Sequence, residues 1–330
     1  MLRKDHSSNR VLLGASRLDV SPVCFGTWQL SPRFWGDLPK KEILQAMDRA
    51  LDLGINFFDT ADAYGDGYAE TVLGEFLKGK PRDRVVVCSK VFNHFNPDGS
   101  RYPDLSPEHI AERCDIELQR LGTDHIDLYL LHMYDPLTRL SDCTGALETL
   151  KKQGKIREYG VSNFTVEQLK AARRFGSYSV VQPPYSLIAA EIEADLLPYC
   201  QSENLGVMVY SPLHKGLLSG KYEGSETFLD FRKNHPDFHG ERFRRIAQAV
   251  RELKPLAEQY DMSIYQLVLS ATLMHPAIQV ALVGVKKAEQ IQEAAAVLGK
   301  MLSREHYFAV RRILSIEGLP KVQDARGDKK

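Results

Sequence analysis

The chain has 330 residues, enough for two average domains or for one large barrel with a substantial core. Hydrophobic residues make up 43% and charged residues 26%, and 43 Lys and Arg side chains balance 43 Asp and Glu, which gives no indication of a nucleic-acid partner. No apolar run approaches the roughly 20 residues of a membrane span, and none follows the charged start MLRKDHSSNR, so neither a membrane protein nor a secreted one is predicted.

Cysteine usage indicates a reducing compartment. The five cysteines (Cys24, Cys88, Cys114, Cys143 and Cys200) are scattered and form no CxxC pair. An odd, dispersed set in a chain of this length is typical of reduced thiols and not of a disulfide framework or a zinc site. We therefore expect a cytoplasmic protein.

Apolar runs typical of buried strands alternate along the chain with segments of helical periodicity. The expected strands span 21–28, 55–59, 84–90, 125–132, 155–163, 180–186, 206–212 and 277–285. The expected helices span 38–54, 69–79, 106–122, 144–154, 165–176, 193–204 and 288–298. Ser106 is the predicted N-cap of its helix, with Pro107 at the first helical position, and Thr165 is the predicted cap of another.

This alternation predicts the α/β class, with parallel βαβ units. Eight strand-like runs fit a closed (β/α)8 TIM barrel better than an open doubly wound sheet, and we expect one domain over residues 1–330. Residues 213–241 form a long loop after strand 7, of the kind that serves as a functional lid or as a disordered spacer. Residues 303–317 predict an extra C-terminal helix, and 321–330 a polar tail that frays.

Four side chains of complementary chemistry lie at or near the ends of three successive strands. Asp59, Lys90 and His132 close the runs INFFD, RVVVCSK and HIDLYLLH, and Tyr64 follows the first run by five residues. In a parallel barrel these strand ends converge on one face. A lysine beside Tyr64 would lower the pKa of the phenol from about 10, a carboxylate would hold the lysine, and the imidazole would orient a substrate oxygen. Each residue alone is more often a turn, a cap or a packed side chain, but together they predict a proton donor for carbonyl reduction.

Metal-dependent chemistry is not predicted. The chain has no HxH or HExxH motif, and His125 and His132 are seven apart on one strand and so point to opposite faces. This disfavours a metal-dependent barrel hydrolase, and we expect no metal site. No GxGxxG follows an early strand, so a Rossmann cofactor site is not indicated either.

The stretch GINFFDTADAYGDGYAETVLGEFL resembles the signature of the aldo-keto reductase superfamily. The resemblance continues through SK (89–90), LLH (130–132), GVSNF (160–164), Gln182 with PYS, YSPLHKGLLSGKY (210–222) and LVGVKKAEQIQEA (282–294), and covers roughly residues 11–300. The insertion, with FRKNHPDFHGERF, looks most like the bacterial branch that includes inositol-related and general-stress reductases.

The resemblance implies a role for each matching position. Asp59, Tyr64, Lys90 and His132 would form the catalytic tetrad, with Tyr64 as general acid. The implied contacts of a nicotinamide cofactor are Gly26, Thr27, Ser162, Asn163, Gln182 and Tyr210 near the ring, Ser211, Leu213 and Gly216 along the pyrophosphate, and Gly284, Lys286, Lys287, Gln290 and Glu293 at the adenine and phosphate end. Seven residues on the expected carboxyl-end loops could line the substrate pocket or pack under the lid: Trp28, Phe34, Trp35, Phe92, Met133, Tyr134 and Arg232. Of these, Trp28, Phe92 and Met133 are the predicted substrate contacts.

The implied cofactor is NADPH, because Lys286 and Lys287 precede a helix whose N-terminus favours anions. NADH remains possible, since Ala294 and Val283 replace a common Asn and Pro of the family pattern. The implied activity is interconversion of an aldehyde or ketone with its alcohol on a small-molecule substrate. The alternative is a cofactor-binding regulatory subunit with little or no turnover, as in potassium-channel β subunits, which keep the tetrad. No nucleic-acid or membrane partner is expected, and the oligomeric state stays open.

Overall fold

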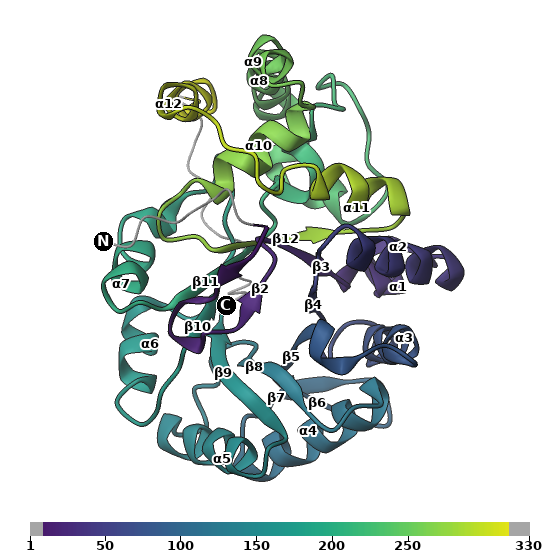
Figure 1. Ribbon diagram of the computed structural model, residues 1–330, viewed down its shortest axis with the longest axis vertical. Helices are drawn as coiled ribbons and strands as arrows, with labels where there is room; N and C mark the ends of the chain where they lie inside the picture. Colours follow the sequence, from purple (N-terminus) through teal and green to yellow (C-terminus); the bar gives the residue numbers. More distant parts are fainter. Residues whose placement is uncertain (1–8, 317–330) are drawn as a thin grey trace.

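The computed structural model describes residues 9–316, and its centre is a ring of eight parallel strands (Figure 1). These strands are β3 (Val23–Gly26), β4 (Phe57–Asp59), β5 (Val86–Val91), β8 (Ile126–Leu131), β9 (Ile156–Ser162), β10 (Val180–Gln182), β11 (Gly206–Tyr210) and β12 (Val280–Gly284). The ring closes where β12 pairs with β3, with Gly284 opposite Gly26. The predicted (β/α)8 TIM barrel is therefore confirmed. The tail predicted over 321–330 lies outside the described residues.

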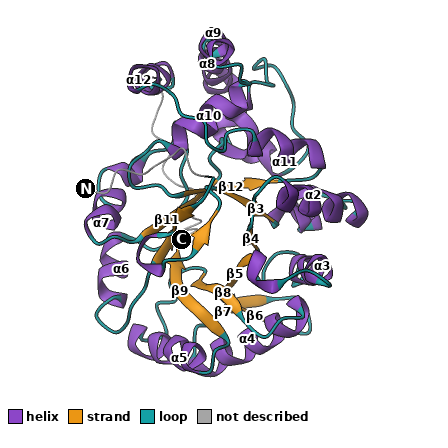
Figure 2. Ribbon diagram, viewed as in Figure 1, coloured by secondary structure: helices purple, strands orange, loops and turns teal. Residues whose placement is uncertain are grey.

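Helices surround the ring of strands (Figure 2). They are α1 (Pro32–Trp35), α2 (Lys40–Asp52), α3 (Tyr68–Leu77), α4 (Pro107–Leu121), α5 (Leu140–Lys152), α6 (Val166–Ala172), α7 (Leu196–Ser202), α8 (Gly240–Arg251), α9 (Lys254–Gln259), α10 (Ile264–Leu273), α11 (Ala288–Ala295) and α12 (Arg304–Ile313). The predicted caps hold, since the hydroxyls of Ser106 and Thr165 accept backbone N–H bonds at the starts of α4 and α6. No helix in the described part of the chain is long and apolar enough to cross a bilayer.

Side chains that point into the barrel form a compact apolar cluster. It includes Phe57 of β4, Cys88 of β5 and Leu130 of β8. Successive side chains of a strand point to opposite faces, so the residue two positions later lies on the same face. Asp59, Lys90 and His132 each stand two residues after one of these core residues. The strand geometry therefore directs all three inward at the carboxyl ends of their strands.

A short hairpin that the sequence did not predict covers the opposite end of the barrel. Its strands β1 (Val11–Leu12) and β2 (Asp19–Val20) pair antiparallel, and Figure 1 shows the hairpin crossing the barrel opening. Leu13 and Val20 join the interior cluster. Two-residue strands carry too little periodicity to be recognised in a sequence. The hairpin makes the barrel a packed core closed at its amino-terminal end.

The long segment after β11 folds back on itself. It contains the 3-10 helices η5 (His214–Ser219), η6 (Phe231–Asn234) and η7 (Pro236–Phe238), and α8 begins at Gly240. Rings of Tyr222, Phe228, Phe238 and Phe243 pack together, with centroids 4.9 Å apart for Phe228 and Phe238. Of the two alternatives expected for residues 213–241, a functional lid or a disordered spacer, the disordered spacer is wrong because the segment is folded and packed.

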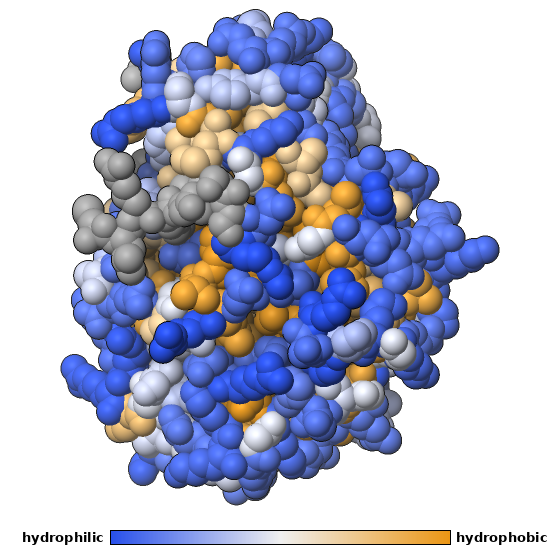
Figure 3. All heavy atoms as spheres, viewed as in Figure 1, coloured by the Kyte–Doolittle hydropathy of each residue, from blue (hydrophilic) through white to orange (hydrophobic). Residues whose placement is uncertain are grey.

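Residues 242–276 carried no predicted element, yet they contain most of α8 and all of α9 and α10, and α8 begins at Gly240 within the predicted loop. The buried residues of α8, among them Phe243, Ile246 and Val250, do show helical spacing, so the signal was present. The second missed hairpin joins β6 (Asn93–Phe95) to β7 (Arg101–Pro103) after β5. The face seen in Figure 3 is mostly hydrophilic, with apolar residues gathered toward its middle.

Candidate active site

Lys90 is the centre of the predicted tetrad. Its ammonium donates to Asp59 Oδ1 at 2.7 Å, to the carbonyl oxygen of Thr60 at 2.7 Å and to the Tyr64 hydroxyl oxygen at 3.2 Å. An ammonium has three protons, and here each has an acceptor. Because Tyr64 accepts from Lys90, the proton of the phenol itself stays available to another group. The Thr60 carbonyl, a backbone group, had no signal in the sequence.

Asp59 is held on both oxygens. Its second oxygen, Oδ2, accepts a hydrogen bond of 2.8 Å from Gln182 Nε2 of β10. Both partners and Lys90 are buried, so the charged pair is shielded from water and well satisfied. Gln182 was expected to contact the nicotinamide. In the structure, one N–H of its side-chain amide holds the carboxylate of Asp59 in place.

Burial sets the protonation states of the site. Loss of hydration raises the pKa of the Tyr64 phenol to about 12, although the neighbouring Lys90 charge acts to lower it. Lys90 acts in the expected direction, but burial outweighs its charge, so the pKa of the phenol is not brought below its usual value as the sequence led us to expect. Burial and then Lys90 lower the pKa of His132 to about 3, so the imidazole is neutral. Tyr64 is thus protonated at neutral pH, as a proton donor must be.

His132 lies across Tyr64, with ring centroids 5.9 Å apart and planes at 79°. Both rings are half-buried and lie at the carboxyl end of the barrel. Asn163 braces this side of the site, because its Nδ2 donates to the His132 carbonyl oxygen at 3.0 Å and its Oδ1 accepts from the Tyr210 hydroxyl at 2.8 Å. Asn163 has a positive φ of 58°, a conformation that Asn tolerates better than most residues.

The residues implied to surround the nicotinamide lie together. Ser162 donates to the carbonyl oxygen of Gln182, and Asn163 donates to the Ser162 hydroxyl. Thr27, directly after β3, donates to the carbonyl oxygen of Asp59, and Gly26 pairs with Asp59 across the sheet. The strand ends β3, β9, β10 and β11 thus supply one contiguous patch beside the tetrad.

The residues implied to follow the pyrophosphate lie in a tight turn after β11. Ser211 and Gly216 have positive φ angles of 59° and 92°, and Leu213 is buried. Gly216 is favoured there because glycine adopts this backbone without strain. The turn brings the segment back over the barrel end.

At the implied phosphate end, Gly284 closes β12 and two lysines precede α11. Lys286 lies over the Trp35 ring, with Nζ 4.2 Å from the centroid, and burial followed by the charge of Arg232 lowers the pKa of its ammonium. Lys287 is exposed at the N-cap of α11. The Gln290 side chain accepts from the backbone N–H of Lys286, and Glu293 accepts from Ser263.

Two buried polar atoms beside this end have no hydrogen-bond partner among residues 9–316. They are Gln29 Oε1 and Trp35 Nε1. The Gln29 amide packs against Gly284, and the Trp35 ring lies under Lys286. Unsatisfied buried groups are costly and rare. Both Lys286 and Arg232 lie over the Trp35 ring, and their charges suit an anionic ligand such as a dinucleotide.

The three residues expected to contact substrate differ in their surroundings. Phe92 is partly buried against the core, and Met133 is 40% exposed. Trp28 packs against Trp35 and Phe231, with centroids 5.4 Å and 5.5 Å away, and so joins the first loop to the long segment after β11. Arg232 donates to Asp230 and Tyr222, which ties it to that segment.

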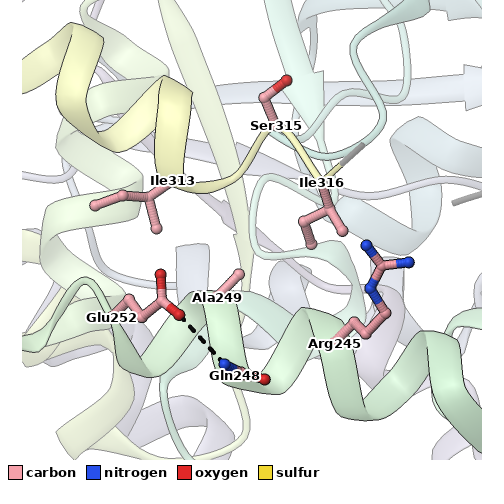
Figure 4. A pocket seen from close by; sticks show the side chains of 7 residues that line it. All are labelled: Arg245, Gln248, Ala249, Glu252, Ile313, Ser315 and Ile316. Carbon is pink, nitrogen blue, oxygen red and sulfur yellow. Dashed lines mark hydrogen bonds between the residues drawn. The ribbon is translucent and has the colours of Figure 1, made fainter. Parts of the chain in front are cut away.

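A pocket away from the tetrad is shown in Figure 4. It lies between α8 and the chain after α12, and its lining includes Arg245, Glu252 and Ile316. Gln248 and Glu252 hydrogen-bond to each other along α8. None of the residues implied by the resemblance lines it.

Comparison with known proteins agrees with this geometry. The model of the Aldo/keto reductase family matches residues 22–315. The chain is 33% identical over 302 residues to the aldo-keto reductase YhdN of Bacillus subtilis (90% of this chain, 91% of that protein). It is 32% identical over 308 residues to an NADH-specific methylglyoxal reductase of Escherichia coli (89% and 94%). The solved structure of a glycerol dehydrogenase from Gluconobacter oxydans superimposes with a TM-score of 0.86 at 33% identity (93% and 95%). The chain therefore belongs to the aldo/keto reductase family, whose members are oxidoreductases of carbonyls and alcohols.

Proposed function

We propose that this chain is an NADPH-dependent reductase of aldehydes or ketones in which Tyr64 donates the proton. The observation that carries the proposal is the position of Lys90 Nζ, 2.7 Å from Asp59 Oδ1 and 3.2 Å from the Tyr64 oxygen. A fixed ammonium at that distance stabilises the phenolate that remains after the proton has left.

Each residue of the tetrad has a separate role in the proposed reaction. A nicotinamide dinucleotide, when bound, supplies the hydride to the carbonyl carbon. Tyr64 transfers its proton to the carbonyl oxygen, and Lys90 stabilises the charge left on the phenolate. Asp59 holds the ammonium in place, and neutral His132 can hydrogen-bond the carbonyl oxygen and orient it. In the reverse direction the phenolate accepts the proton of the alcohol.

The cofactor preference is proposed from the exposed lysine at the start of α11. Replacing Lys287 by Met should weaken NADPH binding at least about ten-fold and NADH binding little, because only NADPH carries a 2′-phosphate for the ammonium to meet. Fluorescence titration with both cofactors measures this. Lys300→Met, at another exposed lysine, should change neither affinity. Equal losses of affinity for both cofactors would show that Lys287 does not bind the 2′-phosphate. Tighter binding of NADH than of NADPH by the unaltered chain would instead resemble the NADH specificity of its methylglyoxal reductase relative.

Turnover distinguishes the enzyme from a regulatory subunit. Purified protein is mixed with NADPH and a panel of short and aromatic aldehydes, and cofactor absorbance is followed. Sustained oxidation that depends on the aldehyde supports the proposal. Tight NADPH binding without turnover on any member of the panel, or on alcohols with NADP⁺, would support the regulatory alternative instead.

A further inference from the structure

A second group of ionisable side chains lies outside the tetrad, where the β6–β7 hairpin meets the start of α4. His94 Nδ1 lies 3.7 Å from Asp104 Oδ2, and His109 Nδ1 lies 3.9 Å from the same oxygen. One possible ligand atom from each of the three residues lies within 4.8 Å of the other two. The hairpin follows β5, the strand that carries Lys90, but none of the three residues touches the tetrad in the contacts described above.

The hydrogen bonds around His109 determine which of its nitrogens carries a proton. Its Nε2 lies 3.1 Å from the carbonyl oxygen of Asn93, which can only accept. Nε2 must therefore be the N–H, and in the neutral ring Nδ1 presents a lone pair toward Asp104. The backbone carbonyl thus orients the imidazole in the way that outer partners orient metal-binding histidines.

His94 supplies the second nitrogen. Its Nδ1 is buried and has no hydrogen-bond partner among residues 9–316, which is costly for a polar atom. The ring is held by stacking on Tyr102, its cross-strand neighbour, with centroids 4.7 Å apart and planes at 14°. The position of this nitrogen is therefore fixed by packing, and no hydrogen bond within residues 9–316 occupies it.

We propose that His94, Asp104 and His109 bind a divalent transition-metal ion, Zn²⁺ being the best fit. Two imidazole nitrogens and one carboxylate oxygen, with water as a fourth ligand, are a donor set typical of zinc. Ligand atoms about 2.1 Å from a tetrahedral ion lie roughly 3.4 Å apart. The two nitrogen-to-oxygen distances, 3.7 Å and 3.9 Å, therefore need to shorten by about half an ångström or less. The sequence predicted no metal site. The three proposed ligands match no short motif, because they are spread over a hairpin, the loop after it and a helix.

The carboxylate of Asp104 is fixed through its other oxygen, because Oδ1 accepts the backbone N–H of Ser106 at 2.8 Å. Arg113, a cation of α4, is held 3.6 Å from Asp62 and over the Phe95 ring.

A similar group elsewhere in the chain offers a contrast. His214, His235 and Asp237 also lie within 4.8 Å of one another. There, however, the carboxylate is shared by His214 and Arg242, and His235 Nε2 lies 3.1 Å from Lys215 Nζ. Two cationic side chains thus already contact the possible ligands of this group. Of the two groups found in the described part of the chain, the hairpin group is the one without such a contact.

An ion at this site would clamp the hairpin to α4. Asp104 also donates its backbone N–H to the Phe92 carbonyl oxygen at 2.8 Å, so the clamp adjoins a residue implied to contact substrate. The ion would then stabilise the fold of this loop, since a ligand that binds the folded chain alone raises its stability.

The test uses the full chain without an affinity tag, treated with chelator and then titrated with ZnCl2 by calorimetry and with CoCl2 by visible absorption. One ion should bind per chain, cobalt should show the d–d bands of a tetrahedral site, and zinc should raise the melting temperature. His109→Gln and Asp104→Asn should each weaken binding at least about ten-fold. His235→Gln, the matched control in the second group, should leave binding unchanged.

Absence of saturable binding by the unaltered chain would overturn the proposal, whatever the variants do. So would unchanged affinity in His109→Gln, or loss of binding in His235→Gln. Circular dichroism of each variant separates a lost ligand from a lost fold. Because these readouts involve neither cofactor nor carbonyl, they stand or fall independently of the reductase function.

Discussion

At the scale of single residues, Lys90 determines what the site can do. It is a fully buried ammonium with three acceptors, and its ion pair with Asp59 raises its pKa above the ordinary lysine value despite burial. Removing one partner of such a pair leaves the other charge buried and unpaired, which typically costs about 3–5 kcal/mol. The pair is therefore part of the fold as well as of the proposed chemistry, so replacing either residue changes both.

The neutral state of His132 leads to a prediction about pH. Its pKa is lowered to about 3, so the ring should not gain a proton between pH 8 and pH 5, where an ordinary histidine would. The rate of carbonyl reduction at saturating cofactor should therefore show no break near pH 6.5. A stopped-flow profile over this range checks it. A break in the native protein that disappears in His132→Gln would mean that His132 titrates normally.

Residue types and their order predicted the tetrad, but not the contacts within it. Asp59, Lys90 and His132 were recognisable because each ends an apolar run typical of a strand. Each stands two positions after a side chain that points into the barrel. The bond from Gln182 to Asp59 joins positions 123 residues apart, and the Thr60 carbonyl has no side-chain signal. The raised pKa of Tyr64 depends on how much water the fold removes, which sequence patterns do not report.

At the scale of elements, the segment after β11 is fixed by a buried network. Asp237 of η7 bonds to His214 Nε2 at 2.6 Å and to Arg242 of α8, while His214 Nδ1 lies 3.1 Å from the Ser186 hydroxyl. Burial alone would raise the pKa of Asp237, but its bonds to His214 and Arg242 outweigh burial and bring it to about 2. The network joins the loops that follow β10 and β11 and so supports the side of the site where the residues proposed to follow the pyrophosphate lie.

Asp237→Asn should lower the free energy of unfolding by about 2 kcal/mol at neutral pH, because the pKa falls from its usual value near 4 to about 2. The carboxylate is favoured in the folded state, so its contribution is present above pH 4 and is lost as pH falls toward 2. Urea denaturation at pH 7 and pH 3 measures the difference. Asp230→Asn, which removes a more exposed carboxylate of the same segment, should cost under about 0.5 kcal/mol. Equal losses in the two variants would show that the buried network is not what anchors the segment.

Elements with clear periodicity were predictable, and short or polar ones were not. Most of the eight barrel strands are rich in apolar residues, as buried parallel strands are, although β9 includes the charged residues Arg157 and Glu158. The β6–β7 hairpin contains Asn93, His94 and Arg101, polar residues with no alternation, so only pairing in the folded chain defines it. For the same reason the sequence did not predict the proposed metal site, which depends on this hairpin.

At the scale of the whole molecule, the amino-terminal hairpin closes the barrel through a close backbone contact. Gly14 has a φ of 53°, and a Cβ at this position would lie 2.6 Å from the Cα of Gly206 at the start of β11. Gly14→Ala should therefore lower the free energy of unfolding by about 3–5 kcal/mol, combining backbone strain with overpacking. Thermal and urea denaturation measure the change.

Gly79→Ala isolates the strain from the clash. Gly79 also has a positive φ, 74°, but a Cβ there would meet nothing within 4 Å. This variant should cost only about 1–2 kcal/mol. If both substitutions lower the free energy of unfolding equally, the hairpin does not pack closely against the end of the barrel.

The central claim is that Tyr64 provides the proton from a site assembled by Lys90, Asp59 and His132. The most direct measurement is single-turnover reduction of an aldehyde by Tyr64→Phe with bound NADPH, beside Tyr68→Phe as an exposed-tyrosine control. Phenylalanine keeps the ring and removes only the hydroxyl, so reduction should fall at least about 10²–10⁴-fold while the dissociation constant of NADPH changes little. Tyr68→Phe should reduce the aldehyde at the native rate. Reduction by Tyr64→Phe within a few-fold of that rate would contradict the account.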